Sequence, residues 1–421
     1  MSDAGAALAE VVGPGHVLAG DRAAAFAVGG RVPRWVAFPE TAAEVARCLA
    51  VAAERGLSVA PTGRGNRLHW GNPPRALELV LSLRRLDRIL AHEAADLTIS
   101  VEAGVTLAAI AERLRAFRQL LPLDPPRAAG STVGGIVATA ASGPYRARYG
   151  TIRDLLLGVT VARSDGTVVK GGGRVVKNAT GYDTPKLHVG ALGTLGVVVA
   201  AHLRLHPRPA VEATWLFQFG SAESVLEAAL GVMDAAVVVS RLQLLDSPAL
   251  AVTVGSVAEG VRAQGALIAE ICGRAGGVES PLGDAEAWWA GVREVAWPPT
   301  PDCLALRVGV RPTDVVKAWR AVEAAARDAC ACRATAEVAN GLLHLVLTGP
   351  GLVEAPRLLG TVREGLAPLG GSAVVEHAPA AVAPALEAWG DAGPALDVMR
   401  RLKAEMDPAG ILNPGRYVGG I

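Results

Sequence analysis

The chain has few cysteines, and their spacing excludes several kinds of site. Five of its 421 residues are Cys, and no two of them form a Cys-x-x-Cys pair. Structural zinc and iron–sulfur sites need thiolates clustered at such spacings, so we expect no metal and no cluster on this chain. The odd, scattered set also argues against a disulfide framework and fits a reducing compartment. These residues are Cys48, Cys272, Cys303, Cys330 and Cys332.

The chain also lacks an excess of charge of one sign. Lys and Arg number 41 and Asp and Glu number 40, which gives a net charge of +1 without any run of basic residues. Nucleic-acid-binding proteins carry a basic patch, so we expect no nucleic-acid partner. Hydrophobic residues make up 51% of the chain, which excludes a disordered protein. The length suffices for two or three domains.

Long apolar runs are missing as well. The longest uncharged stretch, residues 128–145, contains four glycines and several Ser and Thr residues, unlike a membrane-spanning helix. The N-terminus carries Asp3 and Glu10 and no basic region, so it is a poor secretory signal. We expect a chain without a transmembrane segment, in the cytoplasm or attached to a membrane only through a partner.

Glycine, in contrast, is abundant, and it is concentrated in three loops. Glycine lets a backbone approach another group closely, so three such loops in the first half predict a large cofactor held at several points. The loops are PTGRGNR (Pro61 to Arg67), AAGSTVGGIVATAASG (Ala128 to Gly143) and GGGRVVKNATGYDTPKLHVGALGTLGVVV (Gly171 to Val199).

The first loop has the composition of an anion-binding turn. Gly63 and Gly65 can present successive N–H groups to a phosphate. No Gly-Lys-Ser/Thr follows, so the loop is not a P-loop, and Leu68 occupies the third position of a dinucleotide-binding fingerprint. The alternative is an ordinary tight loop between a strand and an irregular segment.

The second loop offers hydroxyl donors at Ser131 and Thr132 and close backbone approach at Gly134 and Gly135. A helix beginning here would also favour an anion. The alternative is a packing helix whose glycines allow close contact.

The third loop places Lys177-Asn178 and Tyr182-Asp183 before a segment, Gly193 to Val198, that enters a strand. Taken singly, Lys177 is better explained as a solvated charge. Tyr182 is better explained as a core aromatic whose hydroxyl reaches water.

Local patterns predict a mixed α and β fold. Thr41 to Glu44 is a capping box that should begin a helix ending at Gly56. Ser164-Asp165-Gly166 should join two strands as a hairpin. Apolar–polar alternation in residues 97–101 predicts a half-buried strand. Further helices are expected over 107–117, 223–233, 315–331 and 396–406, and further strands over 57–60, 77–83, 215–219, 237–245, 303–310 and 342–347.

Two prolines in His206 to Pro209 mark a domain boundary. We therefore divide the chain into a leader (1–34), a mixed α and β domain (35–208), an α+β domain with an antiparallel sheet (209–395) and a C-terminal helix and tail (396–421).

Several segments, in this order and spacing, resemble a known family. PTGRGNR, AGSTVGG and GALGTLGVVV resemble the FAD-binding domain shared by vanillyl-alcohol-oxidase (PCMH-type) flavoproteins. Together with QLLPLDPP (Gln119 to Pro126) and MDPAGILNPGRY (Met406 to Tyr417), they resemble the E subunit, the FAD-binding subunit, of bacterial glycolate oxidase. The resemblance implies an α+β fold: a two-part FAD-binding domain, an α+β cap domain, and a C-terminal tail that packs back on the FAD domain.

The resemblance also implies the residues that would hold FAD. The first loop would hold the pyrophosphate, although GRGNR departs from the family's G-x-G-T-S, so that Asn66 and Arg67 must replace hydroxyl contacts. Neither His nor Cys occurs at positions 64–66, so FAD should be non-covalent. The implied cofactor residues are Pro61, Thr62, Gly63, Arg64, Gly65, Asn66, Arg67, Asp124, Gly130, Ser131, Thr132, Gly134, Gly135, Ser142, Gly143, Gly193, Thr194, Leu195, Gly196, Val197 and Val198.

Oxidation of a 2-hydroxy acid needs a proton acceptor, a cation for the carboxylate and the flavin. The His-rich segment typical of related catalytic subunits is missing from the second domain. His377 is a candidate because Glu376 precedes it and a carboxylate raises a histidine pKa, with a loop histidine of no catalytic role as the alternative. His344 lies in an apolar strand and is interpreted as structural. Candidate carboxylate clamps are Arg127, Arg146 and Arg148.

We therefore expect a subunit of a glycolate oxidase (glycolate dehydrogenase) complex that oxidises glycolate or a related 2-hydroxy acid to the 2-oxo acid. The resemblance implies a catalytic FAD subunit and an iron–sulfur subunit as partners, and a cytoplasmic location, free or peripheral at the inner membrane through the complex. One alternative is a stand-alone FAD-linked 2-hydroxy-acid oxidase or dehydrogenase. The other is a non-catalytic scaffold subunit with a vestigial flavin fold.

Overall fold

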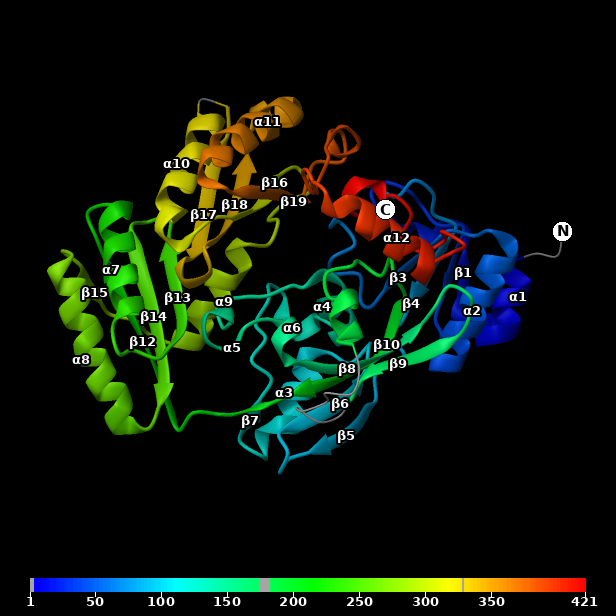
Figure 1. Ribbon diagram of the computed structural model, residues 1–421, viewed down its shortest axis with the longest axis horizontal. Helices are drawn as coiled ribbons and strands as arrows, with labels where there is room; N and C mark the ends of the chain where they lie inside the picture. Colours follow the sequence, from blue (N-terminus) through cyan, green and yellow to red (C-terminus); the bar gives the residue numbers. More distant parts are fainter. Residues whose placement is uncertain (1–3, 174–181, 328) are drawn as a thin grey trace.

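The structure is a computed structural model that describes residues 4–173, 182–327 and 329–421. The first domain, blue to green in Figure 1, holds two larger sheets, and the second, green to orange, is built on a single large sheet. The C-terminal segment, red, returns to the first domain. Within the described residues, no helix combines the length and the apolar character needed to cross a membrane.

The first sheet of the N-terminal domain has four strands in the order β1-β2-β4-β3. They are β1 (Val17–Ala19), β2 (Trp35–Ala37), β3 (Val59–Thr62) and β4 (Leu79–Ser82), with α1 (Ala4–Val12) and α2 (Ala42–Arg55) beside them. The strands β2, β4 and β3 run parallel, whereas β1 is antiparallel to β2. The predicted helix is confirmed as α2: Thr41 Oγ1 accepts the Glu44 N–H at 3.1 Å, and Gly56 ends the helix in a left-handed conformation.

The second sheet is antiparallel, in the order β5-β6-β10-β8-β9. Its strands are β5 (Ile89–Glu93), β6 (Thr98–Glu102), β8 (Leu156–Ala162), β9 (Val168–Gly172) and β10 (Val197–Arg204). The predicted hairpin is confirmed as β8–β9. The expectation of a half-buried β6 is wrong, since all five residues are buried. Side chains cover its polar face: Ser100 Oγ lies 2.7 Å from His202 Nδ1, and Glu102 accepts from Arg88.

Short elements connect this sheet to the rest of the domain. They are α3 (Leu107–Arg115), β7 (Gln119–Leu120), α4 (Val133–Thr139), α5 (Arg146–Tyr149), α6 (Ile152–Leu155) and β11 (His206–Pro207), which pairs with β7. One hydrophobic core joins both sheets, with Leu81 from the first, Leu49 from α2 beside it, and Val101 and Val161 from the second.

The cap domain is one antiparallel sheet in the order β15-β12-β14-β13-β17-β18-β16-β19. Its strands are β12 (Val211–Gln218), β13 (Val239–Leu245), β14 (Ala249–Ser256), β15 (Val278–Ser280), β16 (Leu304–Gly309), β17 (Ala331–Glu337), β18 (Leu342–Thr348) and β19 (Ser372–His377). Its helices are α7 (Ala222–Asp234), α8 (Ala258–Arg274), α9 (Ala285–Val295), α10 (Val315–Ala326) and α11 (Ala355–Leu366).

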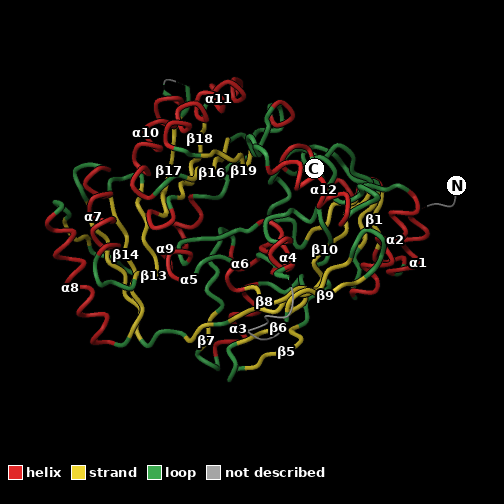
Figure 2. The backbone as a smooth tube through the Cα atoms, in the orientation of Figure 1, coloured by secondary structure: helices red, strands yellow, loops and turns green. Residues whose placement is uncertain are grey.

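The two faces of this cap sheet differ. The helices α7, α8, α10 and α11 cover one face (Figure 2), where Leu242 and Leu244 of β13 join the cap's hydrophobic core. Since strand side chains alternate, Arg241 and Gln243 lie on the opposite face, which is turned toward the first domain and contacts α5. The helix α9 covers the far end of that second face through Trp289.

The helix expected over residues 315–331 is too long. It ends at Ala326, and Ala331 begins β17, where it pairs with Thr348 of β18. The reason is tertiary: β17 joins the two halves of the cap sheet, and this pairing outweighs the helix propensity of an alanine-rich segment.

The predicted return of the C-terminal tail to the first domain is confirmed. The helix α12 (Ala395–Met406) is followed by a segment in which the Asn413 N–H donates to Val59 O at 2.8 Å, and Leu412 bridges β3. Lys403 Nζ donates to Thr194 O and Leu412 O, each at 2.8 Å. The last helix therefore ties the end of the chain to the third glycine-rich loop.

Candidate cofactor and active site

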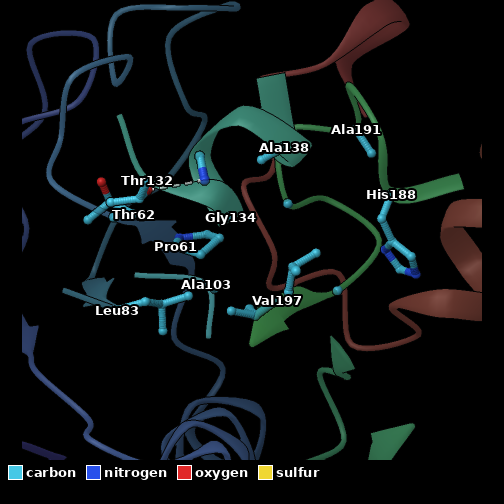
Figure 3. A pocket seen from close by; sticks show the side chains of 15 residues that line it. Pro61, Thr62, Leu83, Ala103, Thr132, Gly134, Ala138, His188, Ala191 and Val197 are labelled. Carbon is cyan, nitrogen blue, oxygen red and sulfur yellow. Dashed lines mark hydrogen bonds between the residues drawn. The ribbon is translucent and has the colours of Figure 1, made fainter. Parts of the chain in front are cut away.

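The first two glycine-rich loops and the end of the third meet in one cleft of the first domain (Figure 3). One part is lined by Pro61, Thr62, Gly63, Leu83, Ala103, Thr132, Gly134, Gly135, Ala138, His188, Ala191, Gly193, Gly196, Val197 and Val198. The adjoining part shares the first loop with it and adds Arg64, Gly65, Asn66, Arg67, Leu68, Gly130, Ser131, Thr139, Leu192 and Arg416.

Two glycines allow the three loops to touch. A Cβ at Gly63 would lie far inside van der Waals contact of Thr132 Oγ1, across the first and second loops. Gly193 has a φ of 70°, and a Cβ there would approach Pro61 Cγ to 2.6 Å. A side chain at either position would force the walls of the cleft apart. The glycine content of these loops is therefore required by the construction of the cleft.

Two buried arginines line the cleft without an ion-pair partner among the described residues. Arg67 donates to Ser131 Oγ at 2.9 Å and to Pro126 O at 2.6 Å, and Arg416 donates to Leu68 O at 2.7 Å. The Nε atom of each guanidinium has no hydrogen-bond partner in the part of the chain that the structure describes. Burial lowers the pKa of both arginines to about 10. A pyrophosphate in this cleft would offset both desolvated charges, so the residues fit FAD.

The other part of the cleft is more apolar. Leu83, Ala103 and Val197 line it, together with His188. Burial lowers the pKa of His188 to about 4, so its ring is neutral near pH 7. An apolar wall with a neutral imidazole suits a flat heteroaromatic ring such as the adenine of FAD.

Two expected residues of the third loop lie beside the cleft and do not line it. The Thr194 hydroxyl donates a hydrogen bond to Ala191 O at 2.7 Å, and the Thr194 carbonyl oxygen accepts one from Lys403 Nζ. Leu195 is buried. Both therefore hold the loop in shape. Lys177 and Asn178 lie outside the described residues. Tyr182 is 94% exposed, so the interpretation of it as a core aromatic is wrong.

A second pocket lies between the domains and shares Arg67 with the cleft. It contains Arg307, His344 and Glu376 from the cap sheet and Ser142 and Arg146 from the first domain. Arg307 Nε donates to Glu376 Oε1 at 2.8 Å. The pocket therefore combines cations, a carboxylate and an imidazole beside the cofactor cleft. Its remaining lining residues are Trp70, Pro126, Ala140, Ala141, Ala296, Trp297 and Pro298.

His344, interpreted from the sequence as structural, lies in this pocket. Its Nδ1 is 3.9 Å from Glu376 Oε2 and has no hydrogen-bond partner among the residues that the structure describes, and its Nε2 is 3.7 Å from Glu337 Oε1. In the sheet it stands directly opposite Arg307. Alternation in β18 was a usable signal, because Leu343 and Leu345 point into the cap core and His344 points away from it.

The other candidate histidine lies elsewhere. His377 Nε2 is 3.0 Å from Pro301 O, and its ring packs on His69 with centroids 5.4 Å apart, in a different pocket between the domains. Of the three candidate clamps, only Arg146 lines the pocket of His344. Arg127 stacks over Trp297, and Arg148 donates to Val238 O.

Asp124 and Gly143 lie together, away from the cleft. A Cβ at Gly143 would overlap Asp124 O, so this glycine permits close packing. The Asp124 Oδ1 accepts the Tyr145 N–H at 3.0 Å. Burial raises the pKa of Asp124 to about 7, against the opposing effect of Arg241 and Arg293. Asp124 lines a separate cavity, between α3 and the cap.

Comparisons with known sequences and structures agree with this architecture. Residues 33–172 match the family described as FAD binding domain, and residues 254–417 match that described as FAD linked oxidases, C-terminal domain. The chain superimposes on p-cresol methylhydroxylase with a TM-score of 0.78, at 14% identity over 98% of this chain and 96% of the other. For the 4-ethylphenol oxidase from Gulosibacter chungangensis the TM-score is 0.76, at 16% identity and the same coverage.

Curated relatives are similar at modest identity. The chain is 28% identical to the probable mitochondrial D-lactate dehydrogenase of Danio rerio, over 92% of this chain and 85% of the relative. It is 29% identical to glycolate oxidase subunit GlcD of Bacillus subtilis (strain 168), over 52% of this chain and 47% of the relative. It is 36% identical to D-2-hydroxyglutarate dehydrogenase of Xanthomonas citri, over 42% of this chain and 38% of the relative. The chain thus spans less than half of the latter two.

The chain therefore carries an FAD-binding domain and the C-terminal domain of FAD-linked oxidases, in the PCMH-type fold. Its cofactor is FAD. The α+β architecture implied by the sequence resemblance is confirmed, with the antiparallel cap following the two-part FAD domain.

Proposed function

We propose that this chain is the FAD-binding E-type subunit of a glycolate oxidase complex. Its reaction is the oxidation of glycolate or a related 2-hydroxy acid to the 2-oxo acid. One observation carries the proposal: Arg67 lines both the cofactor cleft and the pocket that holds Arg307 and His344. A substrate in that pocket would lie next to the flavin. Relatives named as glycolate, D-lactate and D-2-hydroxyglutarate enzymes support the choice of substrate class.

In this proposal, each chemical requirement has a residue. Arg146 and Arg307 bind the substrate carboxylate, because guanidinium groups pair with carboxylates in a bidentate manner. His344 accepts the hydroxyl proton at Nδ1, the atom without a partner. Glu376 stabilises the protonated imidazole and holds Arg307 in place. FAD, when bound, supplies the hydride acceptor.

FAD binding in this proposal uses the first loop, the second loop and residues 193–198, and it is non-covalent. The first-loop positions 64–66 are Arg, Gly and Asn, none of which forms the histidyl or cysteinyl link known for flavins. Arg416 joins the set of cofactor residues because it lines the same cleft. In this proposal the functional units are the leader (1–34), the FAD-binding domain (35–208), the cap domain (209–395) and the C-terminal helix and tail (396–421).

The proposed partners are a catalytic FAD subunit and an iron–sulfur subunit, at a cytoplasmic location or peripherally at the inner membrane. The cysteines of this chain support the need for such partners. Three of the five are buried, and burial raises the pKa of Cys48 and Cys272 to about 12, which disfavours the thiolate that a cluster needs. Electrons would therefore leave the flavin through another chain.

A stand-alone 2-hydroxy-acid dehydrogenase is the second candidate. The Danio rerio relative, which this chain covers over 85% of its length, is named as an enzyme and not as a subunit. The pocket around His344 also contains an imidazole and three guanidinium groups from this chain alone. A scaffold with a vestigial flavin fold is less well supported, because the cleft retains the charges and glycines that FAD needs.

The test uses the isolated full chain reconstituted with FAD. We expect flavin absorption bands, release of FAD on acid precipitation, and anaerobic bleaching by glycolate, D-lactate or D-2-hydroxyglutarate. His344→Gln and Arg307→Met should slow bleaching at least 100-fold while the flavin bands remain, since a general base contributes about 10²–10⁴-fold. The control is Arg311→Met, an exposed cap arginine paired with Asp314.

Three outcomes separate the candidates. Bleaching of the isolated chain without turnover, with turnover restored by co-expressed partner subunits, supports the complex. Turnover by the chain alone with a soluble acceptor supports the stand-alone enzyme. A chain that gives no flavin bands, and whose complex keeps full activity after Gly63→Ala, would be a scaffold.

A further inference from the structure

The cavity between α3 and the cap is separate from the cofactor cleft and from the pocket of His344. It has a volume of about 580 Å³. The turn of residues 128–130 lies between it and the cleft: Ala128 and Ala129 line the cavity, whereas Gly130 lines the cleft. Neither the FAD site nor the proposed substrate site accounts for this space.

One wall of the cavity is apolar and the other is charged. Leu107 and Ile110 of α3, with Leu120, Leu121 and Leu123 after it, form the apolar wall. The charged wall has three arginines and three carboxylates, so its formal charges cancel. They are Arg208, Arg241, Arg293, Asp124, Glu212 and Glu286.

Most of these charged groups are already paired. Glu286 accepts from Arg241 at 3.1 Å and from Arg293 at 3.0 Å. Glu212 accepts from the Tyr145 hydroxyl at 3.2 Å. A carboxylate ligand would face three acids and an ammonium ligand three guanidinium groups, so the balance favours an uncharged ligand.

Two buried atoms have no hydrogen-bond partner among the described residues: Arg241 Nε and Asp124 Oδ2. Arg241 is 2% exposed and Asp124 5% exposed, and both line the cavity. The two atoms are 3.8 Å apart, too far for a hydrogen bond with each other. One hydroxyl oxygen beside both can accept from Nε–H and donate to Oδ2. A buried polar atom without a hydrogen bond costs free energy, so a ligand hydroxyl that pairs with both atoms at once is strongly favoured.

We propose that this cavity binds a phenol-class ligand, an uncharged aromatic ring carrying a hydroxyl group. The hydroxyl bridges Arg241 and Asp124, and the ring packs on the apolar wall at Leu121. Tyr145 holds the guanidinium in place, since Arg241 Cζ lies 4.0 Å from the centre of its ring. The exposed Arg208 beside Pro209 marks the entrance from solvent. This site does not depend on the oxidation proposed above.

The experiment compares p-cresol with toluene, which has the same ring and methyl group without the hydroxyl. Binding to the FAD-loaded full chain is measured by isothermal titration calorimetry. We expect p-cresol to bind at least tenfold more tightly than toluene. Arg241→Met should remove this difference. Leu121→Trp, which fills the apolar side and leaves both polar atoms in place, should abolish binding of both compounds while flavin absorption is unchanged.

Two controls locate the site. Arg307→Met, in the pocket of His344, should leave p-cresol binding unchanged, and so should Arg262→Met on the exposed surface of α8. Equal affinities for p-cresol and toluene, or binding that survives Leu121→Trp but not Arg307→Met, would overturn the proposal. So would the absence of p-cresol binding to a chain that retains FAD, since the two buried atoms would then be bridged by water only.

Discussion

Arg67 donates a hydrogen bond to Ser131 Oγ at 2.9 Å, and this bond joins the first glycine-rich loop to the second. The same guanidinium donates to Pro126 O at 2.6 Å. Since Arg67 also lines the pocket of His344, one side chain links the cofactor cleft to the space between the domains. Loss of Arg67 should therefore weaken FAD binding more than it lowers the stability of the fold.

We predict that Arg67→Met raises the dissociation constant of FAD about 10- to 100-fold. The substitution removes a charge that the pyrophosphate needs and leaves Ser131 and Pro126 without their donor, and a charged hydrogen bond contributes roughly 1.5–3 kcal/mol. Titration of the apoprotein, followed by quenching of flavin fluorescence, measures the change. Arg115→Met, at an exposed arginine of α3, is the matched control and should leave the affinity unaltered. An Arg67→Met variant that binds FAD as tightly as the parent would contradict the role assigned here.

A second prediction concerns the contact between Gly63 and Thr132. Alanine at position 63 would place its Cβ against Thr132 Oγ1, so the first two loops must separate. We expect Gly63→Ala to weaken FAD binding more than tenfold and to lower the melting temperature of the apoprotein by a few degrees, as for about 1 kcal/mol of overpacking. Gly220→Ala is the matched control, because a Cβ there meets no atom within 4 Å. Equal behaviour of the two variants would show that the loops do not pack as described.

Local sequence signals predicted the parts of the fold that depend on neighbours along the chain. The helix start at Thr41 and the turn at Ser164 to Gly166 are each encoded within a few residues, and both are present. At Thr41 only half of the predicted capping box forms, because Glu44 Oε2 accepts from the Glu40 N–H and not from the Thr41 N–H. The extended helix over 315–331 was wrong because the strand beginning at Ala331 is stabilised by partners in β13 and β18. Such partners are remote in sequence, and no local pattern reports them.

The residues of the candidate site also fall into those that local sequence predicts and those that depend on partners remote in sequence. Loop glycines such as Gly63 can be identified from composition, because clustered glycines indicate that the backbone approaches another group closely. Arg416 and Leu68 are 348 residues apart in the chain, and only the return of the tail brings the arginine into the cleft. Likewise, His344 faces Arg307 because β18 pairs with β16, so its surroundings could not be read from the apolar residues beside it.

A third prediction tests how the tail is held. Lys403 Nζ forms hydrogen bonds with Thr194 O, Leu412 O and the buried carboxylate of Asp407. Lys403→Met leaves Asp407 without its cation, and breaking a buried pair costs roughly 3–5 kcal/mol. We expect a loss of about 3 kcal/mol in the free energy of unfolding, measured with urea, together with weaker FAD binding through the displaced loop at Thr194.

The control for this prediction is Lys317→Met, at a lysine that is 70% exposed and pairs with Asp314. An exposed pair contributes only about 0.2–1 kcal/mol. Similar losses for the two lysine variants would mean that Lys403 does not act as the anchor of the tail.

The last prediction follows from the buried imidazole of His188. Burial lowers its pKa from 6.5 to about 4 in the folded protein, so the unfolded chain binds the extra proton first as the pH falls. The stability that the neutral ring contributes is fully present above pH 6.5 and is lost as the pH falls through 4. A shift of this size corresponds to roughly 3 kcal/mol.

In urea unfolding of the apoprotein at pH 7 and pH 4.5, His188→Gln should lose less stability between the two pH values than the parent does. His16→Gln, at an exposed histidine, should keep the full loss. An unchanged pH dependence in His188→Gln would assign the acid sensitivity to other groups, among which His69, with a pKa lowered to about 3, is the next to test.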